Sequence, residues 1–452
     1  MKRTLSLLFI TLIAACSLSA QTSRKSVALT VYNNDLGVVR EKLSLPSQSG
    51  IFEIKLTDVP ERIDPTSVKL NLDGEVLEQN FRYDLVDVYR ILQKYVDKEI
   101  TLVGPTTIRG ALLSAVPTGG ETDGGQIVIR NPDGGLTMLT KIDGYQISAP
   151  SLPSGLVTKP TLQWQIRGTR SGNQDAELSY MTGGMGWHAE YVATLDEAEK
   201  TMSFLSWVSI ENESGANYEN AELRLIGGDV HRAVRPQAVY RADMAYEEAA
   251  QGKRFAPQFQ EEQFFEYHEY TLQRPATILN RETKQISLFE AEKVPVTKKY
   301  VYTSGQNVDV AIKFANKKDN NLGMPLPAGT VRIFKTKGSS NQFVGEDLIK
   351  HTPKDEEITL KVGKVFDIIA EERQTSQERI DEHTGEIGYE IVFRNRKDED
   401  VTIEVERNIG FNAKIISASE KYEMKDAQTA RFIIKVPKGG EAKLTYLVRN
   451  TW

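Results

Sequence analysis

The sequence contains almost no cysteine: Cys16 is the only one among 452 residues. This residue lies in an amino-terminal segment that resembles an export signal, so we expect a mature protein with no disulfide bond and no thiol nucleophile. Packing rather than covalent cross-linking must then stabilise the folded chain.

The sequence also lacks a surplus of positive charge and, after the first residues, any long apolar run. It has 56 Lys and Arg against 62 Asp and Glu, which gives a formal net charge of -6. Nucleic acids and anionic lipids bind clustered Lys and Arg, so neither is expected as a main partner. No later run of apolar residues is long enough to cross a bilayer.

The first residues, MKRTLSLLFITLIAACSLSAQ, place a basic pair before an apolar run of signal-peptide length, so residues 1–20 are predicted to be a signal peptide. Two processing sites fit. The stretch IAAC resembles a bacterial lipobox, in which Cys16 becomes the lipidated first residue; ordinary cleavage after Ala20 would instead leave Gln21 at the terminus. Both predict an exported protein, in the periplasm or at the outer membrane, and a lipid on Cys16 would be its only anchor.

Common catalytic motifs are missing as well. The sequence has no Gly-x-Ser-x-Gly elbow, no phosphate-binding loop of the Walker type and no HExxH. We therefore predict no cofactor and favour a protein that is not an enzyme, although a missing motif does not exclude catalysis.

Alternating apolar residues dominate what is present. Stretches such as KSVALTVYNNDLGVVREKLSL show the period of two that half-buried strands require, with turn residues between them. In DLVDVYRILQKYV the apolar spacing instead predicts one short helix, residues 84–96, begun by Asp84. We expect an all-β fold of tandem antiparallel β-sandwich domains with a small barrel of the SH3 or Sm kind.

A chain of this length is too long for one hydrophobic core. After the signal peptide, the pattern divides it into four predicted parts: an N-terminal β segment (21–97), a small β-barrel (98–150), a central β-sandwich (155–362) with a long insertion at about 236–263, and a C-terminal immunoglobulin-like sandwich (363–452).

Several stretches, in this order, are similar to one known family: YNNDLGVVRE, LSYMTGGMGWHAEYVATL, WVSIENESGANYENAELRLIGGDV, NNLGMPLPAGTVRIF and FRNRKDEDVTIEV. The chain resembles the DUF4139 family, a domain of uncharacterised function that also occurs in proteins called mucoidy inhibitors. The resemblance implies an exported all-β protein and suggests a link to exopolysaccharide or envelope homeostasis. The long coiled-coil insertion of some relatives is missing here.

The five histidines supply weak candidates for a metal site. His188 and Glu190 share one face of a predicted strand, and so do Asp229 and His231. Glu266 and His268 have the same spacing. None of these pairs comes with a third ligand, so a structural role is favoured for each. The acidic run at 355–357 could bind calcium weakly, although a solvated turn explains it more simply.

Aromatic residues are the remaining candidates. Trp164, Trp187 and Trp207 fall in one predicted β domain with Tyr180 and Tyr191, where they could form a sugar-binding platform but are more often core residues.

Two Gly- and Pro-containing segments complete the candidates. The polar middle of WVSIENESGANYENAELRLIGGDVHRA is interpreted as a turn, and the two prolines of LGMPLPAG as a stiff structural loop. For both segments, ligand binding is the less favoured alternative.

The leading hypothesis is a non-enzymatic envelope protein that binds a protein or glycan partner through its β-sandwich surfaces. The alternative is a glycan-acting hydrolase with paired carboxylates. A cleft that combines two carboxylates with exposed aromatic rings would favour the alternative.

Overall fold

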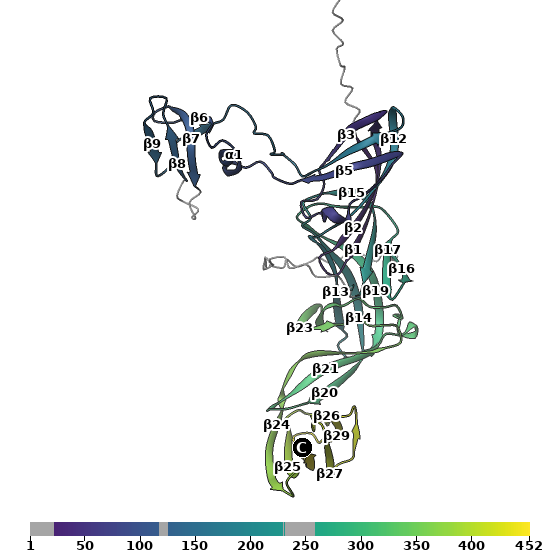
Figure 1. The fold of residues 1–452 in the computed structure, drawn as a ribbon. Helices are drawn as coiled ribbons and strands as arrows, with labels where there is room; N and C mark the ends of the chain where they lie inside the picture. Colours follow the sequence, from purple (N-terminus) through teal and green to yellow (C-terminus); the bar gives the residue numbers. More distant parts are fainter. Residues whose placement is uncertain (1–21, 117–124, 229, 231–257) are drawn as a thin grey trace, which may run out of the picture.

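The computed structural model describes residues 22–116, 125–228, 230 and 258–452 (Figure 1). Nearly all regular structure in these residues is β, so the predicted all-β class is confirmed. The predicted signal segment with Cys16, and both Asp229 and His231, lie outside the described residues. The described helices are α1 (Val88–Lys94) and two single 3₁₀ turns, η1 (Pro65–Ser67) and η2 (Lys318–Asn320).

Three sheets share the largest hydrophobic core, and we call this unit the central body. An eight-stranded sheet has the order β16-β17-β15-β1-β2-β12-β4, with β18 paired to β15. Its strands are β1 (Ser23–Tyr32), β2 (Gly37–Ser47), β4 (Lys69–Asn71), β12 (Gly172–Thr182), β15 (Tyr218–Gly227), β16 (Phe259–Phe264), β17 (Tyr267–Leu272) and β18 (Ala276–Ile278). A three-stranded sheet contains β3 (Gly50–Thr57), β11 (Thr161–Gly168) and β5 (Gly74–Arg82).

The third sheet of this body, called the central sheet below, has the order β19-β14-β13-β22-β23. Its strands are β13 (Met185–Leu195), β14 (Thr201–Asn212), β19 (Glu282–Pro295), β22 (Gly329–Lys337) and β23 (Ser340–Ile349). Residues of both predicted ranges, 21–97 and 155–362, lie in the one core that the three sheets enclose.

β13 shows how the sequence produces this layering. Its residues alternate strictly between buried and half-exposed because successive side chains point to opposite faces of a strand. Trp187 and Tyr191 therefore enter the core, whereas His188 and Glu190 lie on the outer face. β13 pairs antiparallel with β14 but parallel with β22. The predicted antiparallel order holds for most strand pairs, and β13–β22 is among the exceptions.

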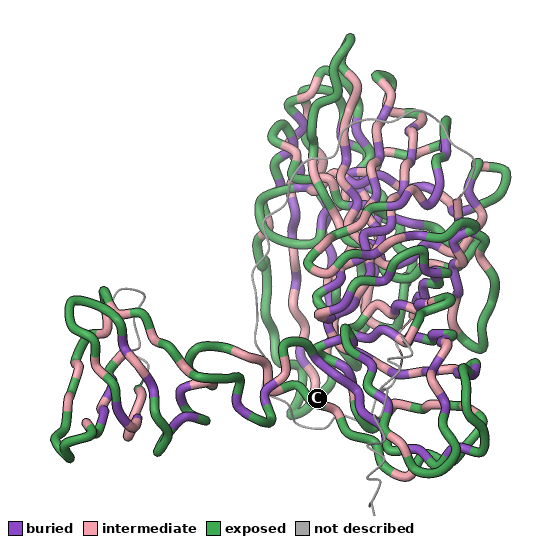
Figure 2. The backbone as a smooth tube through the Cα atoms, turned by 90° about the horizontal axis from the view of Figure 1, so that it is seen from above, coloured by how far each residue is buried: buried purple, intermediate pink, exposed green. Residues whose placement is uncertain are grey.

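Residues 88–148 form a separate small unit, the satellite domain, which stands beside the central body in Figures 1 and 2. Its sheet has the order β10-β6-β7-β8-β9. β10, the last of these strands in the sequence, returns to pair with β6, the first, as in a small barrel. Within the described residues the edge strands β9 and β10 are not paired with each other. The strands are β6 (Glu99–Val103), β7 (Ile108–Val116), β8 (Gln126–Arg130), β9 (Leu136–Leu139) and β10 (Gln146–Ser148).

The helix of the satellite domain is shorter than predicted. It begins after Asp87, whose side chain accepts a hydrogen bond from the Arg90 amide at 2.8 Å. Asp84, the predicted first residue, instead forms an ion pair with Arg90 at 3.0 Å. Both aspartates precede the apolar residues closely enough to cap the start of the helix, and the sequence pattern did not show which of them does so.

The C-terminal sandwich has its own core and one nine-stranded sheet, β27-β30-β25-β24-β21-β20-β26-β29-β28. It includes two strands from before residue 363, because β20 and β21 pair with β26 and β24. Its strands are β20 (Thr297–Tyr302), β21 (Asn307–Ala315), β24 (Glu357–Arg379), β25 (Thr384–Asn395), β26 (Val401–Asn408), β27 (Ala413–Ala418), β28 (Tyr422–Met424), β29 (Thr429–Val436) and β30 (Glu441–Thr451).

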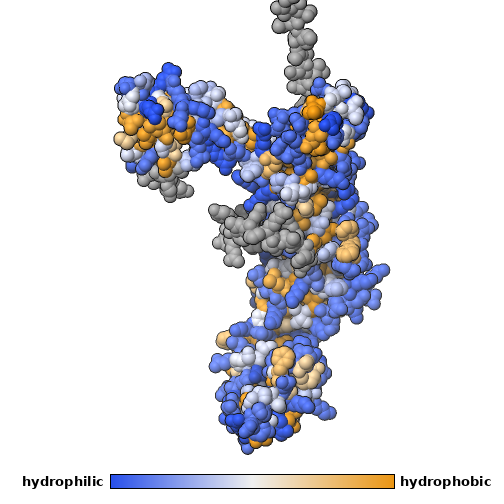
Figure 3. Space-filling view, in the orientation of Figure 1, coloured by the Kyte–Doolittle hydropathy of each residue, from blue (hydrophilic) through white to orange (hydrophobic). Residues whose placement is uncertain are grey.

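The visible surface is mainly hydrophilic, with hydrophobic residues gathered on the satellite domain and near β3 (Figure 3). Among the described residues, no helix has the length and apolar character needed to cross a membrane.

Candidate functional site

The outer face of the central sheet carries the candidate site. Residues that lie opposite one another in the strand register point to the same side of a sheet. The register of β14 with β13 and β19, and of β13 with β22, places a continuous set of polar side chains and one indole on this face. We call this set the polar track; its members are His188, Glu190, Trp207, Ser209, Glu211, Thr283, Gln285 and Arg332.

An ion-paired cluster forms the lower part of the polar track. The Glu190 carboxylate accepts a hydrogen bond from Arg332 at 2.7 Å, and its other oxygen lies 3.3 Å from Nε2 of His188. The Glu190 side chain is 12 % exposed, and those of Arg332 and His188 are 29 % and 36 % exposed. The hydrogen bond from His188 and the Arg332 guanidinium lower the pKa of Glu190 to about 2. Glu190 is therefore a fixed negative charge at neutral pH.

This cluster does not resemble a nucleophilic triad, although a serine lies beside it. Ser209 is the register partner of His188, but its side chain is buried. The Ser209 hydroxyl accepts a hydrogen bond from Gln285 at 3.1 Å. Since the ring nitrogen Nε2 of His188 faces Glu190, the arrangement offers no activated serine hydroxyl to a substrate.

Trp207 gives the polar track its one aromatic side chain. Its register partners on the neighbouring strands are Glu190 and Ser287, and it is half-buried. Trp207 thus differs from the other predicted platform residues, which are core residues as favoured from the sequence: Trp164, Trp187, Tyr180 and Tyr191 are all at most 2 % exposed. Within the central sheet, Trp187 and Tyr191 lie on the inner face and Trp207 on the outer face, whereas Trp164 and Tyr180 belong to the other two sheets of the central body.

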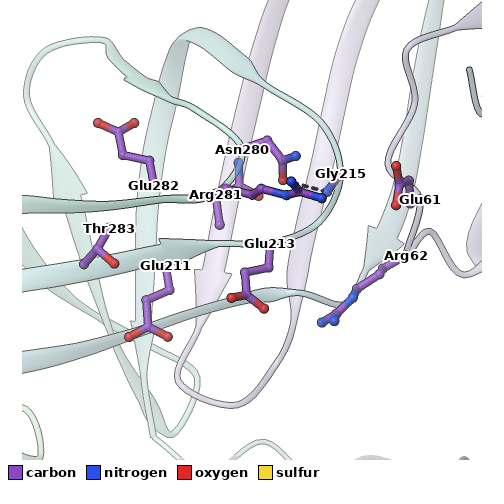
Figure 4. A pocket seen from close by; sticks show the side chains of 10 residues that line it. Glu61, Arg62, Glu211, Glu213, Gly215, Asn280, Arg281, Glu282 and Thr283 are labelled. Carbon is purple, nitrogen blue, oxygen red and sulfur yellow. Dashed lines mark hydrogen bonds between the residues drawn. The ribbon is translucent and has the colours of Figure 1, made fainter. Parts of the chain in front are cut away.

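The upper end of the polar track opens into a cavity of about 510 Å³ (Figure 4). Glu211 and Thr283, register partners on β14 and β19, lie in its wall. The described residues that line it include four glutamates and two arginines but no aromatic ring: Glu61, Arg62, Glu211, Asn212, Glu213, Gly215, Asn280, Arg281, Glu282 and Thr283. The combination of carboxylates with exposed rings that the hydrolase hypothesis requires is therefore not found in this cavity.

The turn after β14 forms one wall of the same cavity. Asn212 is fully buried, and its side-chain amide donates to the carbonyl groups of Ala216 (2.9 Å) and Leu279 (3.0 Å). Its side-chain oxygen accepts from the backbone and hydroxyl of Ser214. These bonds fix the turn, which agrees with the interpretation of this stretch as a structural turn. The same turn also shapes the cavity.

A second cavity, of about 790 Å³, lies on the other side of this turn. At its base the buried Glu41 carboxylate accepts hydrogen bonds from Arg24 at 2.8 Å and from the Tyr180 hydroxyl at 2.9 Å. Burial raises the pKa of Tyr180 well above its ordinary value, and the nearby Tyr218 and Glu41 add to the increase. Because Glu41 has an internal partner on each oxygen, this network holds strands together rather than presenting a reactive group.

The remaining sequence candidates do not assemble into a metal site. His268 bonds to Glu261 at 2.7 Å across the β16–β17 hairpin rather than to Glu266. Glu357 pairs with Lys313, which lowers its pKa. Across residues 22–116, 125–228, 230 and 258–452, no three His, Cys, Asp or Glu side chains converge as metal ligands, so His188 and Glu190 have no third metal ligand there. Asp229 and His231 lie outside these ranges.

The proline-containing loop before β22 has a structural role, as favoured from the sequence. The carbonyl groups of Pro325 and Pro327 accept hydrogen bonds from the buried hydroxyls of Tyr270 (3.1 Å) and Tyr191 (2.7 Å). At Gly329 any Cβ atom would lie 1.9 Å from the Ala189 carbonyl oxygen, so only glycine permits this close pairing of β22 with β13.

Arg332 and Gln285 are among the members of the polar track that were missed in the sequence. Arg332 lies 142 residues from Glu190, and only the parallel pairing of β13 with β22 brings them together. Gln285 reaches Ser209 through the pairing of β14 with β19. Alternation in GTVRIFKT and KQISLFE places both residues on the polar side of a strand, which was the available signal, but it does not identify the neighbouring strand.

The fold and this surface define a mainly β protein of several sheets, whose main polar site is an open sheet face that leads into a cavity. Residues 176–452 match the domain of unknown function DUF4139, and the chain belongs to this family. Comparison with curated proteins gives no match.

Proposed function

We propose that the protein is an exported component of the cell envelope that binds a partner without catalysing a reaction, and that the polar track is its contact surface. The observation that supports this most directly is the Arg332–Glu190–His188 cluster. These groups are held in place by one another on an accessible face, and such pre-organisation favours binding because little side-chain freedom remains to be lost.

The charge state of Glu190 supports binding rather than acid–base catalysis. A general acid or base works best when its pKa lies near the operating pH. The pKa of Glu190 is about 2, so its carboxylate neither holds a proton to donate nor accepts one readily at neutral pH. The hydrolase alternative would also need an aromatic subsite beside its carboxylates, and no ring lies among the described residues that line the 510 Å³ cavity.

The export part of the proposal rests on the signal-like residues 1–20, and the envelope role on the resemblance to mucoidy inhibitors, which suggests a link to exopolysaccharide or envelope homeostasis. Mass spectrometry of the mature amino terminus tests the anchor. A diacylglyceryl group on Cys16 would establish a lipoprotein, and Cys16→Ala would then block its maturation. An unmodified Gln21 terminus would reject the lipid anchor and support a soluble exported form.

Site-directed photo-crosslinking in intact cells tests the binding role. A photoreactive amino acid replaces Gln285, which is exposed on the polar track, and in a matched variant replaces Lys435, which is exposed on β29 of the C-terminal sandwich. We expect a discrete adduct from position 285 that disappears when Arg332→Ala is added. Equal adducts from both positions, or none from position 285, would contradict the proposal.

A further inference from the structure

Resting on the proposed binding role, we propose that the ligand of the polar track is a neutral glycan chain that lies along β14. One sugar ring packs against the Trp207 indole, and its hydroxyl groups bond to the Glu190–Arg332–His188 cluster. The chain continues past Ser209 and Gln285 toward Glu211 at the mouth of the cavity.

The position of Trp207 supplies the first argument. A sugar ring presents an apolar face of C–H groups, and an indole is a large apolar surface whose electron-rich face attracts them. In the strand register, Trp207 lies between Ser287 of β19, a small residue, and Glu190 of β13. An apolar surface and a charged hydrogen-bond acceptor therefore lie side by side, as the ring face and the hydroxyl groups of one sugar require.

The hydrogen-bonding capacity of the cluster supplies the second argument. A carboxylate has about four acceptor sites. Among the described residues each oxygen of Glu190 has one partner, which leaves each with a further acceptor site for a sugar hydroxyl. Because the side chain is already fixed, ordering it costs little on binding. A negative acceptor also matches neutral hydroxyl donors and repels anionic ligands.

The extent of the polar track supplies the third argument. Trp207, Ser209 and Glu211 are alternate residues of one strand, and from the first to the last they span roughly 13 Å at about 3.3 Å per residue. Trp207 is flanked in register by Glu190 and Ser287, and Ser209 by His188 and Gln285. Glu211 has polar Thr283 on one side and Gly186 on the other. Such a row suits an extended, hydroxylated chain better than a single small molecule.

Other ligand classes fit this face less well. A nucleic acid needs clustered positive charge, but here the one arginine is paired with Glu190 and a second carboxylate, Glu211, lies further along. Strand addition by a peptide uses the open edge of a sheet. The polar track instead lies on a sheet face, and β14 and β13 already have neighbours on both sides. Charge and hydrogen-bonding pattern together favour a neutral glycan.

Isothermal titration of the full-length mature protein with neutral hexasaccharides of glucose and of N-acetylglucosamine tests this. We expect binding of at least one hexasaccharide at millimolar or lower concentration, and a loss of affinity of at least about tenfold in Trp207→Ala and in Arg332→Ala. The matched control is Trp452→Phe, which alters an exposed tryptophan of the C-terminal sandwich and should bind as the parent does. No binding heat with any hexasaccharide, or unchanged affinity in both track variants, would overturn the glycan assignment.

The two proposals fail in different ways. If position 285 crosslinks to a protein while no hexasaccharide binds, the glycan assignment is overturned and the binding role stands. If neither experiment gives a track-dependent result, both are overturned. Release of reducing sugar from a bound hexasaccharide would keep the glycan assignment and contradict the non-catalytic role.

Discussion

The two faces of the central sheet use the same strands for different purposes. On the inner face, Tyr191 and Phe204 stack with ring centroids 5.1 Å apart, and Trp187 packs edge-on against Tyr270 at 5.8 Å. On the outer face, His188 and Glu190 of β13 form a cluster with Arg332 of β22, beside Trp207. One strand thus contributes aromatic residues to the core and charged residues to an accessible surface.

The difference shows that residue type alone does not decide the role of an aromatic side chain. Trp187 and Trp207 are both tryptophans on neighbouring strands of this sheet, yet one is 2 % exposed and the other half-buried on the outer face. The side to which the strand register turns each ring decides whether it stabilises the core or remains available to a ligand.

The largest effect is expected from Trp187→Ala on the inner face. The change removes a buried ring and leaves the Ile226 carbonyl oxygen without the indole N–H that donates to it at 3.0 Å. We expect the free energy of unfolding to fall by about 3–5 kcal/mol, measured by chemical denaturation. A loss of less than about 1 kcal/mol would mean that the inner face is not the stabilising one.

A smaller, pH-dependent effect is expected from Glu190→Gln. The folded-state pKa of Glu190, about 2, lies below the ordinary glutamate value of about 4.3. The ion pairs therefore stabilise the fold above that ordinary value, and this contribution is lost as the pH falls from about 4.3 to about 2. At pH 7 we expect the variant to be less stable by about 1–2 kcal/mol.

Denaturation curves of wild type and Glu190→Gln at several pH values between neutral and acidic measure this difference. It should shrink toward zero on acidification. Glu211→Gln is the matched control, since Glu211 lies on the same face and has no ion-pair partner among the described residues; it should leave stability unchanged throughout. A difference that grows as the pH falls would contradict the assigned direction of the pKa shift.

The smallest stability effect is expected from Trp207→Ala. The ring is half-buried and lies on the outer face, so we expect a loss of less than about 1 kcal/mol by the same denaturation measurement. If Trp207→Ala also loses ligand binding, the two faces of one sheet would have different roles: the inner face would determine stability and the outer face would determine binding. A loss as large as that of Trp187→Ala would show that Trp207 belongs to the core.

The sequence was informative wherever local alternation decides the structure. It predicted the strands, the shared face of His188 and Glu190, and the burial of Trp164 and Trp187. It could not predict which distant strands meet. The pairing of β1 with β15, which aligns Ala28 with Glu222 far along the chain, leaves no mark in local composition.

The same limit explains what was missed at the candidate site. In the sequence, Arg332 is an ordinary polar residue of its strand. Its guanidinium contacts Glu190 only because β22 pairs with β13. The core position favoured for Trp207 was wrong, because alternation along β14 does not say which side of that strand faces the core. Long-range register, rather than residue chemistry, was the unknown in both cases.

Strand β24 has a consequence for how the protein can be divided. Its first half pairs with β21 and contributes Ile358 and Leu360 to the central body, whereas its second half pairs with β25 and contributes Ile368 and Ala370 to the C-terminal sandwich. A fragment beginning at residue 363 would lack β20 and β21 and expose the apolar side of its sheet. The two cores are therefore joined through one continuous strand, and a C-terminal unit that keeps its core must include residues from β20 onward.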